Sequence, residues 1–258
     1  MVNALAPHLV TLSLFGLLFG AMELGFRLGS RVKRGNPLPQ LGAIQGATLG
    51  LLGLLLGFAF AGAAGRFIDR QDVIVREANA IGTAYLRADL LAEPHRSAMR
   101  DAVRSYAELR IQLFVALNEA EAARVLDDLG EAERGLWSAA LRGVEADRTV
   151  MMGVLPPVNE MIDLLAVRNA TSDRHLPSAV LVLLVACSFV SLLLIGYGCG
   201  RDQKRQLLAA GSFAFLVAAA LSVTIDLDYP RRGLIRINAS ALEAALHDMR
   251  PAQPAGGR

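Results

Sequence analysis

The carboxylates and arginines that could bind ions or exchange protons gather in two short segments. The first is REANAIGTAYLRADLL, which begins at Arg76, and the second is DLDYPRRGLIRIN, which begins at Asp226. Carboxylates and arginines in such segments suit ion pairing and helix capping more than catalysis. The candidate residues are their charged, polar and turn-forming positions: Glu77, Asn79, Gly82, Thr83 and Arg87 in the first, and Asp226, Asp228, Pro230, Arg231 and Gly233 in the second.

No set of residues in the sequence predicts an enzyme. Asp226 and Asp228 superficially resemble the metal-binding DxD of glycosyltransferases, but no nucleotide-binding pattern accompanies them. The two cysteines share one apolar run, and His95 and His175 stand at opposite ends of the polar region, so neither pair has the spacing of a metal site. We therefore expect no catalytic activity, no metal and no cofactor. With a net charge of only +2, the sequence also gives no sign of a nucleic-acid partner.

The composition is typical of a membrane protein. Hydrophobic residues make up 53% of the 258 residues and charged ones only 19%, with a mean hydropathy of +0.41, whereas soluble domains carry about a quarter charged residues. Four apolar runs, 8–28, 41–65, 178–200 and 206–225, have the roughly 20 residues that cross a bilayer core. We predict an all-α fold with four transmembrane helices and an extramembrane helical bundle between spans two and three. The expected parts are 1–65 with spans one and two, 66–176 with the bundle, 177–225 with spans three and four, and 226–258 as a polar tail.

The second span is marked by glycines at helical spacing: Gly42, Gly46, Gly50, Gly53 and Gly57. Glycines four residues apart leave a smooth groove into which another helix packs closely. Two compatible interpretations stay open. One is helix packing within or between subunits, and the other is the lining of a narrow conduit.

Glu23 interrupts the first span one helical turn before Arg27. This spacing predicts an ion pair at the membrane interface, because an unpaired carboxylate inside a membrane is costly. The alternative is an ion-attracting group that faces a pore.

The second span passes without a proline or a turn cluster into a charged amphipathic stretch, so residues 41–92 predict one helix. At 1.5 Å per residue such a helix is about 75 Å long, more than twice the thickness of the bilayer core. Its projecting half has one apolar stripe, with Glu77 and the neighbouring charges largely off it. The stripe consists of Phe67, Ile74, Ala78, Ile81 and Tyr85.

Partner helices for this projection are predicted at 97–117, 121–130, 131–148 and 158–174, with a stop at Gly130 and a break at Pro156 and Pro157. Amphipathic helices joined by short turns predict an up-down bundle. A row of charges at steps of four marks a solvated face or, in an oligomer, the wall of a vestibule. The row consists of Arg96, Arg100, Arg104 and Glu108.

Short basic loops set the expected orientation. Basic residues cluster at 27–40 and 201–206, between spans one and two and between spans three and four. The positive-inside rule places both loops in the cytoplasm, and the termini and the bundle on the other side. The first apolar run has no small-residue cleavage site, so we expect a retained span rather than a signal peptide.

The two segments described first, REANAIGTAYLRADLL and IDLDYPRRGLIRI, resemble stretches of the bacterial bestrophin-like membrane proteins, a family catalogued as a domain of unknown function. The likeness covers nearly the whole chain, with two spans, a helical domain of this size, two more spans and a short tail. It implies a multi-pass protein of the bacterial inner membrane that is related to bestrophins, which are pentameric chloride channels. The candidate residues of both segments carry over as family-signature positions without known roles.

The sequence and this resemblance together favour a homo-oligomeric ion channel or channel-like protein, for anions, in contact with membrane lipid and small inorganic ions. The supporting features are the close-packing glycines, the helix that is too long to stand alone and the arginine row. The alternative is a membrane sensor or scaffold protein whose bundle receives the input and which does not conduct.

Overall fold

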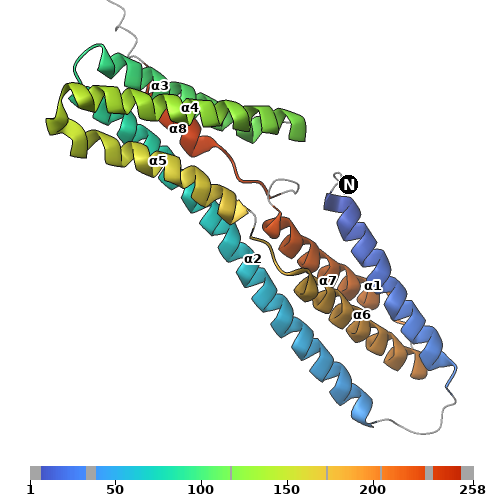
Figure 1. The fold of residues 1–258 in the computed structure, drawn as a ribbon. Coiled ribbons are helices and arrows are strands. Elements are labelled where there is room, and N and C mark those ends of the chain that lie inside the picture. Colours follow the sequence, from blue (N-terminus) through green and yellow to red (C-terminus); the bar gives the residue numbers. More distant parts are fainter. Residues whose placement is uncertain are drawn as a thin grey trace, which may run out of the picture. The chain divides into compact units, whose positions relative to one another are not determined.

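The computed structural model describes residues 7–32, 39–116, 118–172, 174–203, 205–229 and 235–250, and these residues form helices and short connections with no strand. The prediction of an all-α fold is confirmed. The helices, drawn in Figure 1, are α1 (Pro7–Ser30), α2 (Pro39–Arg87), α3 (His95–Val115), α4 (Glu119–Ala146), α5 (Met151–Ser172), α6 (Ser178–Arg201), α7 (Leu207–Asp228) and α8 (Ser240–Asp248), with the short 3-10 helices η1 (Ala88–Leu90) and η2 (Arg148–Val150).

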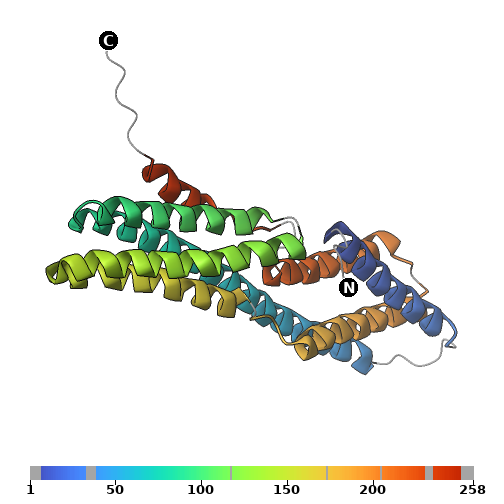
Figure 2. The ribbon, with the colours of Figure 1, turned by 45° about the horizontal axis from the view of Figure 1, so that its top comes forward.

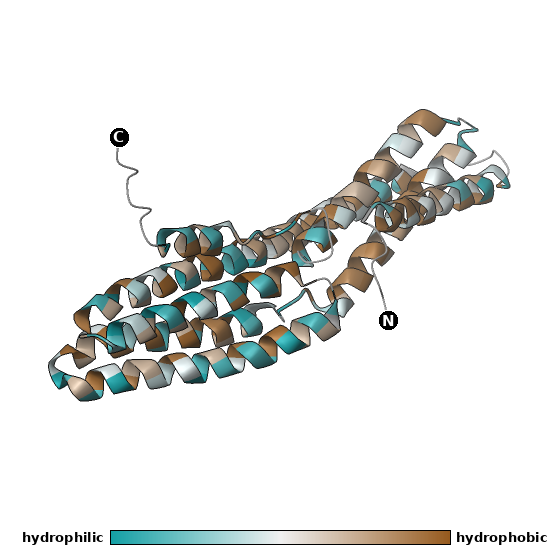
Figure 3. Cartoon of the chain, turned by 90° about the horizontal axis from the view of Figure 1, so that it is seen from above, coloured by the Kyte–Doolittle hydropathy of each residue, from teal (hydrophilic) through white to brown (hydrophobic). Residues whose placement is uncertain are grey.

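The chain divides into two compact units. We call residues 1–68 with 174–236 the apolar unit, and residues 69–173 with 237–258 the bundle. The chain passes from one unit to the other three times, and the first passage lies inside α2, which is one continuous helix of 49 residues. Figure 3 shows the difference in composition: the helices of the apolar unit are mostly hydrophobic, whereas those of the bundle alternate hydrophobic and hydrophilic residues.

Five of the described helices are long and apolar enough to cross a membrane, judged by length and composition. Four of them, α1, the first part of α2, α6 and α7, match the four predicted spans. The fifth covers Arg148–Ser172, which includes α5. Within the bundle α5 buries Val154, Val158, Met161 and Leu164. The number of four spans therefore stays a prediction, as does the cytoplasmic placement of the loops at 27–40 and 201–206, whose residues 33–38 and 204 lie outside the described part.

Glycines let the backbones of α1 and α6 touch in the apolar unit. A Cβ atom added to Gly25 would lie 2.0 Å from the carbonyl oxygen of Leu193, and one added to Gly196 would lie 2.0 Å from that of Met22. Gly29 and Gly200, one turn further along each helix, are equally close to the opposite backbone. This contact is the close approach that glycines four residues apart permit between membrane helices.

Replacing Gly25 by alanine should therefore destabilise the apolar unit by about 1–3 kcal/mol, the usual cost of overpacking, because the added methyl meets backbone that cannot rotate away. Gly20 is the matched control, since a Cβ there meets nothing within 4 Å. Thermal unfolding of both variants in detergent, followed by circular dichroism, measures the difference. Equal melting temperatures for the two variants would show that α1 and α6 are not in contact.

The bundle packs α3, α4, α5, α8 and the second half of α2 around one core. Figures 1 and 2 show α3 beside α4 and α4 beside α5. The predictions of a helix end at Gly130 and of a break at Pro156 and Pro157 are wrong. Helix α4 runs unbroken through Gly130, and α5 runs through both prolines. Both helices keep a buried stripe across the supposed break, and this burial outweighs a glycine cost of about 1 kcal/mol in α4. The stripe of α4 consists of Val125, Leu129, Leu136, Ala140 and Val144.

Residues near the C-terminus also contribute to the bundle. The sequence predicts only a polar tail for residues 226–258, but α8 buries Leu242 completely, and Met249 is buried in the same core. The hydroxyl of Tyr85 and the guanidinium of Arg104 both donate hydrogen bonds to the carbonyl oxygen of Met249, at 2.9 and 3.1 Å. Residues 251–258 lie outside the described part.

Candidate functional site

One face of α2 is open along the apolar unit. All five glycines singled out from the sequence are exposed, and a Cβ added to any of them would meet nothing within 4 Å. At about 100° per residue, Gly42, Gly46, Gly50, Gly53 and Gly57 fall within about 80° of the helix circumference. The opposite face carries Leu52, Ala59 and Ala63, which are buried. The glycine groove therefore has no occupant among the described residues of this chain.

The bundle half of α2 also has an exposed face, formed by residues three or four positions apart or at multiples of these steps. Asn79 and Thr83 from the first signature segment are exposed on it, together with Asp72. Apolar side chains alternate with these polar ones, and Val75 is 48% and Leu86 67% exposed. Both halves of α2 therefore have an exposed face among the described residues.

Glu77 lies on the other side of α2, where it forms a buried ion pair with Arg110 of α3. Both side chains are fully buried, and Arg110 donates from Nε to Oε1 and from Nη2 to Oε2, the latter at 2.8 Å. The expectation that Glu77 lies off the buried stripe is wrong. The buried face of α2 is wider than the predicted stripe, because α2 packs on several helices in the bundle core.

Two further polar side chains surround this ion pair. Within the described residues, the hydroxyl of Tyr106, Nη1 of Arg110 and Oε1 of Glu133 are buried without a hydrogen-bond partner. Burial, and next the Glu77 carboxylate, raise the pKa of Tyr106, so this hydroxyl stays protonated. Burial also raises the pKa of Glu133, although Arg110 and Arg134 act in the opposite direction. Buried polar atoms without partners are costly, so this cluster lowers the stability that the bundle core would otherwise have.

The raised pKa of Glu133 predicts that the bundle loses stability as the pH rises. A group whose pKa is raised by folding contributes stability below its unfolded pKa, and this contribution is lost as the pH passes its folded pKa. Replacing Glu133 by glutamine should remove this loss and give a higher melting temperature than wild type at pH 7. Glu131→Gln, an exposed neighbour on α4, is the control. Fluorescence of Trp137, the only tryptophan and one turn from Glu133, measures the unfolding; a Glu133→Gln variant with the wild-type pH profile would contradict the prediction.

Asp226 and Asp228 of the second signature segment form hydrogen bonds to several other segments near the C-terminal end of α7. Asp228 is buried, and its carboxylate accepts hydrogen bonds from Arg66 Nε and from the backbone N–H of Leu176, both at 2.7 Å. His175 Nδ1 lies 2.9 Å from the carbonyl oxygen of Asp228, and its ring stacks on Tyr229 with the centroids 4.3 Å apart. Asp228 therefore joins the apolar half of α2 to the segment that leads into α6.

Asp226 makes a further connection, because its Oδ2 accepts the backbone N–H of Ile235 at 2.8 Å. These two aspartates thus hold residues near each of the three passages between the units: Arg66, Leu176 and Ile235. Pro230, Arg231 and Gly233 lie outside the described residues. Among the described residues no group of three or more His, Cys, Asp or Glu side chains could hold a metal, and Cys187 and Cys199 are free thiols.

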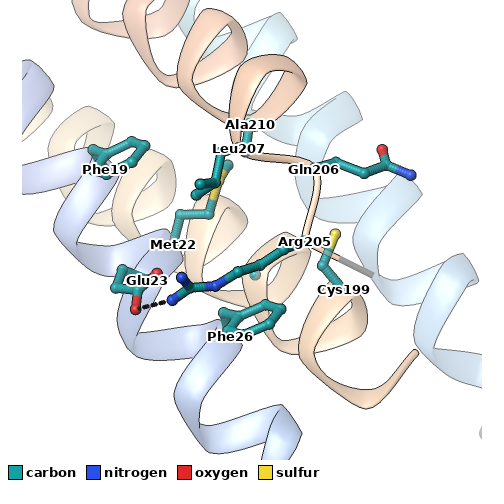
Figure 4. A pocket seen from close by; sticks show the side chains of 10 residues that line it. Phe19, Met22, Glu23, Phe26, Cys199, Arg205, Gln206, Leu207 and Ala210 are labelled. Carbon is teal, nitrogen blue, oxygen red and sulfur yellow. Dashed lines mark hydrogen bonds and ion pairs between the residues drawn. The ribbon is translucent and has the colours of Figure 1, made fainter. Parts of the chain in front are cut away.

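Glu23 is paired with two arginines. Its Oε1 accepts Arg27 Nε at 3.0 Å, as the sequence predicts, and also Arg205 Nη2 at 2.8 Å, which no spacing rule indicates (Figure 4). The arginine row on α3 is also engaged: Arg100 pairs with Asp89, and Arg104 bonds Asp101 at 3.3 Å. This row is therefore only partly solvated, with its charges largely compensated inside the bundle.

The fold and these sites define a helical membrane protein whose longest helix is open along one face, and comparison with known proteins places it in a family. A model of the bestrophin-like domain matches residues 12–242. The chain belongs to the bestrophin-like family, as the two signature segments predict. No curated protein matches the sequence.

Solved structures share the fold over nearly the whole chain. A bacterial bestrophin homologue from Klebsiella pneumoniae is 15% identical with a TM-score of 0.68, covering 93% of this chain and 97% of that one. A singly substituted variant of that homologue is 14% identical with a TM-score of 0.70, at the same coverage. A further structure, described as a membrane protein, is 13% identical with a TM-score of 0.71, also covering 93% and 97%.

Proposed function

We propose that the chain is one subunit of a homo-oligomeric ion channel in the bacterial inner membrane, and that the open face of α2 lines the ion pathway. The observation that carries this proposal is the open face itself. A face of glycines within a span leaves a narrow, uncharged surface, and the polar Asp72, Asn79 and Thr83 follow it outside the span.

The bundle half of α2 supports assembly into an oligomer. On this half of the helix, the Leu86 side chain is 67% exposed and that of Val75 is 48% exposed. Lipid can cover such side chains within a membrane but not beyond it, where exposed apolar patches mark contacts with other proteins. Every copy of the chain carries the same exposed apolar side chains. In copies arranged around an axis, each copy would bury these side chains against its neighbour.

Kinship with bestrophins favours anions as the conducted ions. The arginines of α3 add little to this proposal, because Arg100 and Arg104 are already paired with carboxylates. The exposed charges on the bundle half of α2 are mixed, with Asp69 and Asp72 against Arg76 and Arg87. The selectivity for anions over cations is therefore best measured from the reversal potential in a gradient of potassium chloride.

Reconstitution of the purified full-length chain into planar bilayers tests the proposal. The expected result is a conductance that increases with the amount of protein added. Particle images should show a ring of subunits in which α2 lies nearest the axis. Bilayers that show no conductance, together with a monomeric or dimeric particle, would contradict the proposal of a channel. They would favour the alternative of a membrane sensor or scaffold protein.

A further inference from the structure

An apolar pocket lies between the ends of α1, α6 and α7 in the apolar unit. Its wall is formed mainly by apolar residues, with Gln206 at one edge: Phe19, Met22 and Phe26 from α1, Gly196 and Cys199 from α6, and Leu207 and Ala210 from α7. Glu23 and Arg205 line it as well, and Figure 4 shows the Arg205 guanidinium reaching toward Glu23 beside Phe26. No other described side chain occupies this space.

The rim of the pocket carries more positive than negative charge. Arg27 and Arg205 both donate to the same oxygen of Glu23, so two guanidinium groups share one carboxylate. Both remain accessible, with side chains 69% and 54% exposed. The guanidinium carbon of Arg205 lies 4.9 Å from the centroid of the Phe26 ring, and this cation–π contact holds the arginine at the rim of the pocket.

The surroundings of the pocket are those of a lipid-facing surface. It lies at the ends of three candidate spans, and Leu24, Leu28 and Leu208 are exposed near it. Lipid headgroups meet helix ends at this depth, and basic clusters beside spans attract anionic lipids. A free anion would leave the apolar wall unused, whereas a zwitterionic lipid has no net charge to match the arginines.

We propose that this pocket binds an anionic phospholipid, with one acyl chain against Phe19, Leu207 and Ala210 and the phosphate held by Arg205 and Arg27. The proposal does not depend on conduction, because the pocket is formed by α1, α6, α7 and Arg205 of a single chain. Glu23 takes the role of orienting both arginines toward the rim.

Lipid binding to the delipidated full-length protein in detergent tests the proposal, with native mass spectrometry as the readout. The probes are phosphatidylglycerol, phosphatidylcholine with the same chains, and glycerol phosphate without chains. We expect phosphatidylglycerol to bind about fivefold more tightly than phosphatidylcholine, the effect of one arginine near a headgroup, and glycerol phosphate not to bind.

Two variants test the two halves of the site. Arg205→Gln should weaken phosphatidylglycerol binding about fivefold and leave phosphatidylcholine unchanged, whereas Ala210→Trp should fill the pocket and weaken both lipids. Arg31→Gln is the matched control, because it removes the same charge from the same end of the unit without lining the pocket. Equal losses in Arg31→Gln and Arg205→Gln, unchanged binding in Ala210→Trp, or binding of glycerol phosphate alone would overturn the proposal.

Discussion

Replacing Arg110 by methionine should lower the free energy of unfolding of the bundle by about 3–5 kcal/mol, the cost of removing one partner of a buried ion pair. Glu77 would then stay buried beside Glu133 and Tyr106 with no cation to compensate it. Unfolding by urea in detergent, followed through the fluorescence of Trp137, reports on this unit because the only tryptophan lies there.

Two companion variants separate the buried charge from a general loss of packing. Arg104→Met removes an arginine six residues earlier on α3. Its side chain is 32% exposed and bonds both Asp101 and the carbonyl oxygen of Met249, so its loss should cost about 1–2 kcal/mol, less than that of the buried pair. The double variant Glu77→Leu with Arg110→Leu removes both charges and should recover most of the loss, because apolar replacements of a buried pair are often neutral. A single Arg110→Met variant no less stable than Arg104→Met would contradict the assigned pair.

The long apolar and amphipathic patterns explain why the helices were predictable. The runs at 8–28, 41–65, 178–200 and 206–225 each became a helix, because a bilayer core requires about 20 apolar residues in a segment that satisfies its own backbone. The continuous helix from the second span into the bundle was predictable for a similar reason, since no proline or turn cluster interrupts it. Gly130, Pro156 and Pro157 suggest breaks by their local cost to a helix, but the buried stripe that continues past them outweighs this cost.

The partners of charged residues were far less predictable. Glu77 meets Arg110 33 residues away, and Asp228 meets Arg66 162 residues away, so no helical spacing rule connects them. Glu23 with Arg27 and Asp101 with Arg104 do follow such a rule, but Arg205 also joins Glu23 from 182 residues away. These contacts depend on the packing of the helices, which the pattern of a single segment does not contain.

The glycines show the same limit more clearly. Rows four residues apart occur in α1 and α6, at Gly25 with Gly29 and at Gly196 with Gly200, as well as in α2. The α2 row is the longest in the sequence, but the α1 and α6 rows are the ones that pack on each other within the chain. Spacing alone indicates that a helix face is smooth; it does not indicate whether the partner is the same chain, another copy or an ion pathway.

Replacing Gly53 by leucine should therefore leave the fold of one chain intact and still abolish most of the conductance. A Cβ at Gly53 meets nothing within 4 Å in this chain, so the added side chain extends into the space that the ion pathway is proposed to occupy. An added barrier of about 1.4 kcal/mol is enough to reduce ion flux about tenfold. Single-channel recording in planar bilayers measures this change.

Gly20→Leu is the matched control, since Gly20 is an exposed glycine on α1 with equally open space around it. We expect its conductance to stay near that of wild type. Particle size then distinguishes the two roles of the α2 face: reduced conductance with the oligomer intact indicates lining of the pathway, and dissociation of the oligomer indicates packing between copies. Wild-type conductance in an intact Gly53→Leu oligomer would remove α2 from both roles, because a leucine cannot enter either a narrow pathway or a close helix contact without effect.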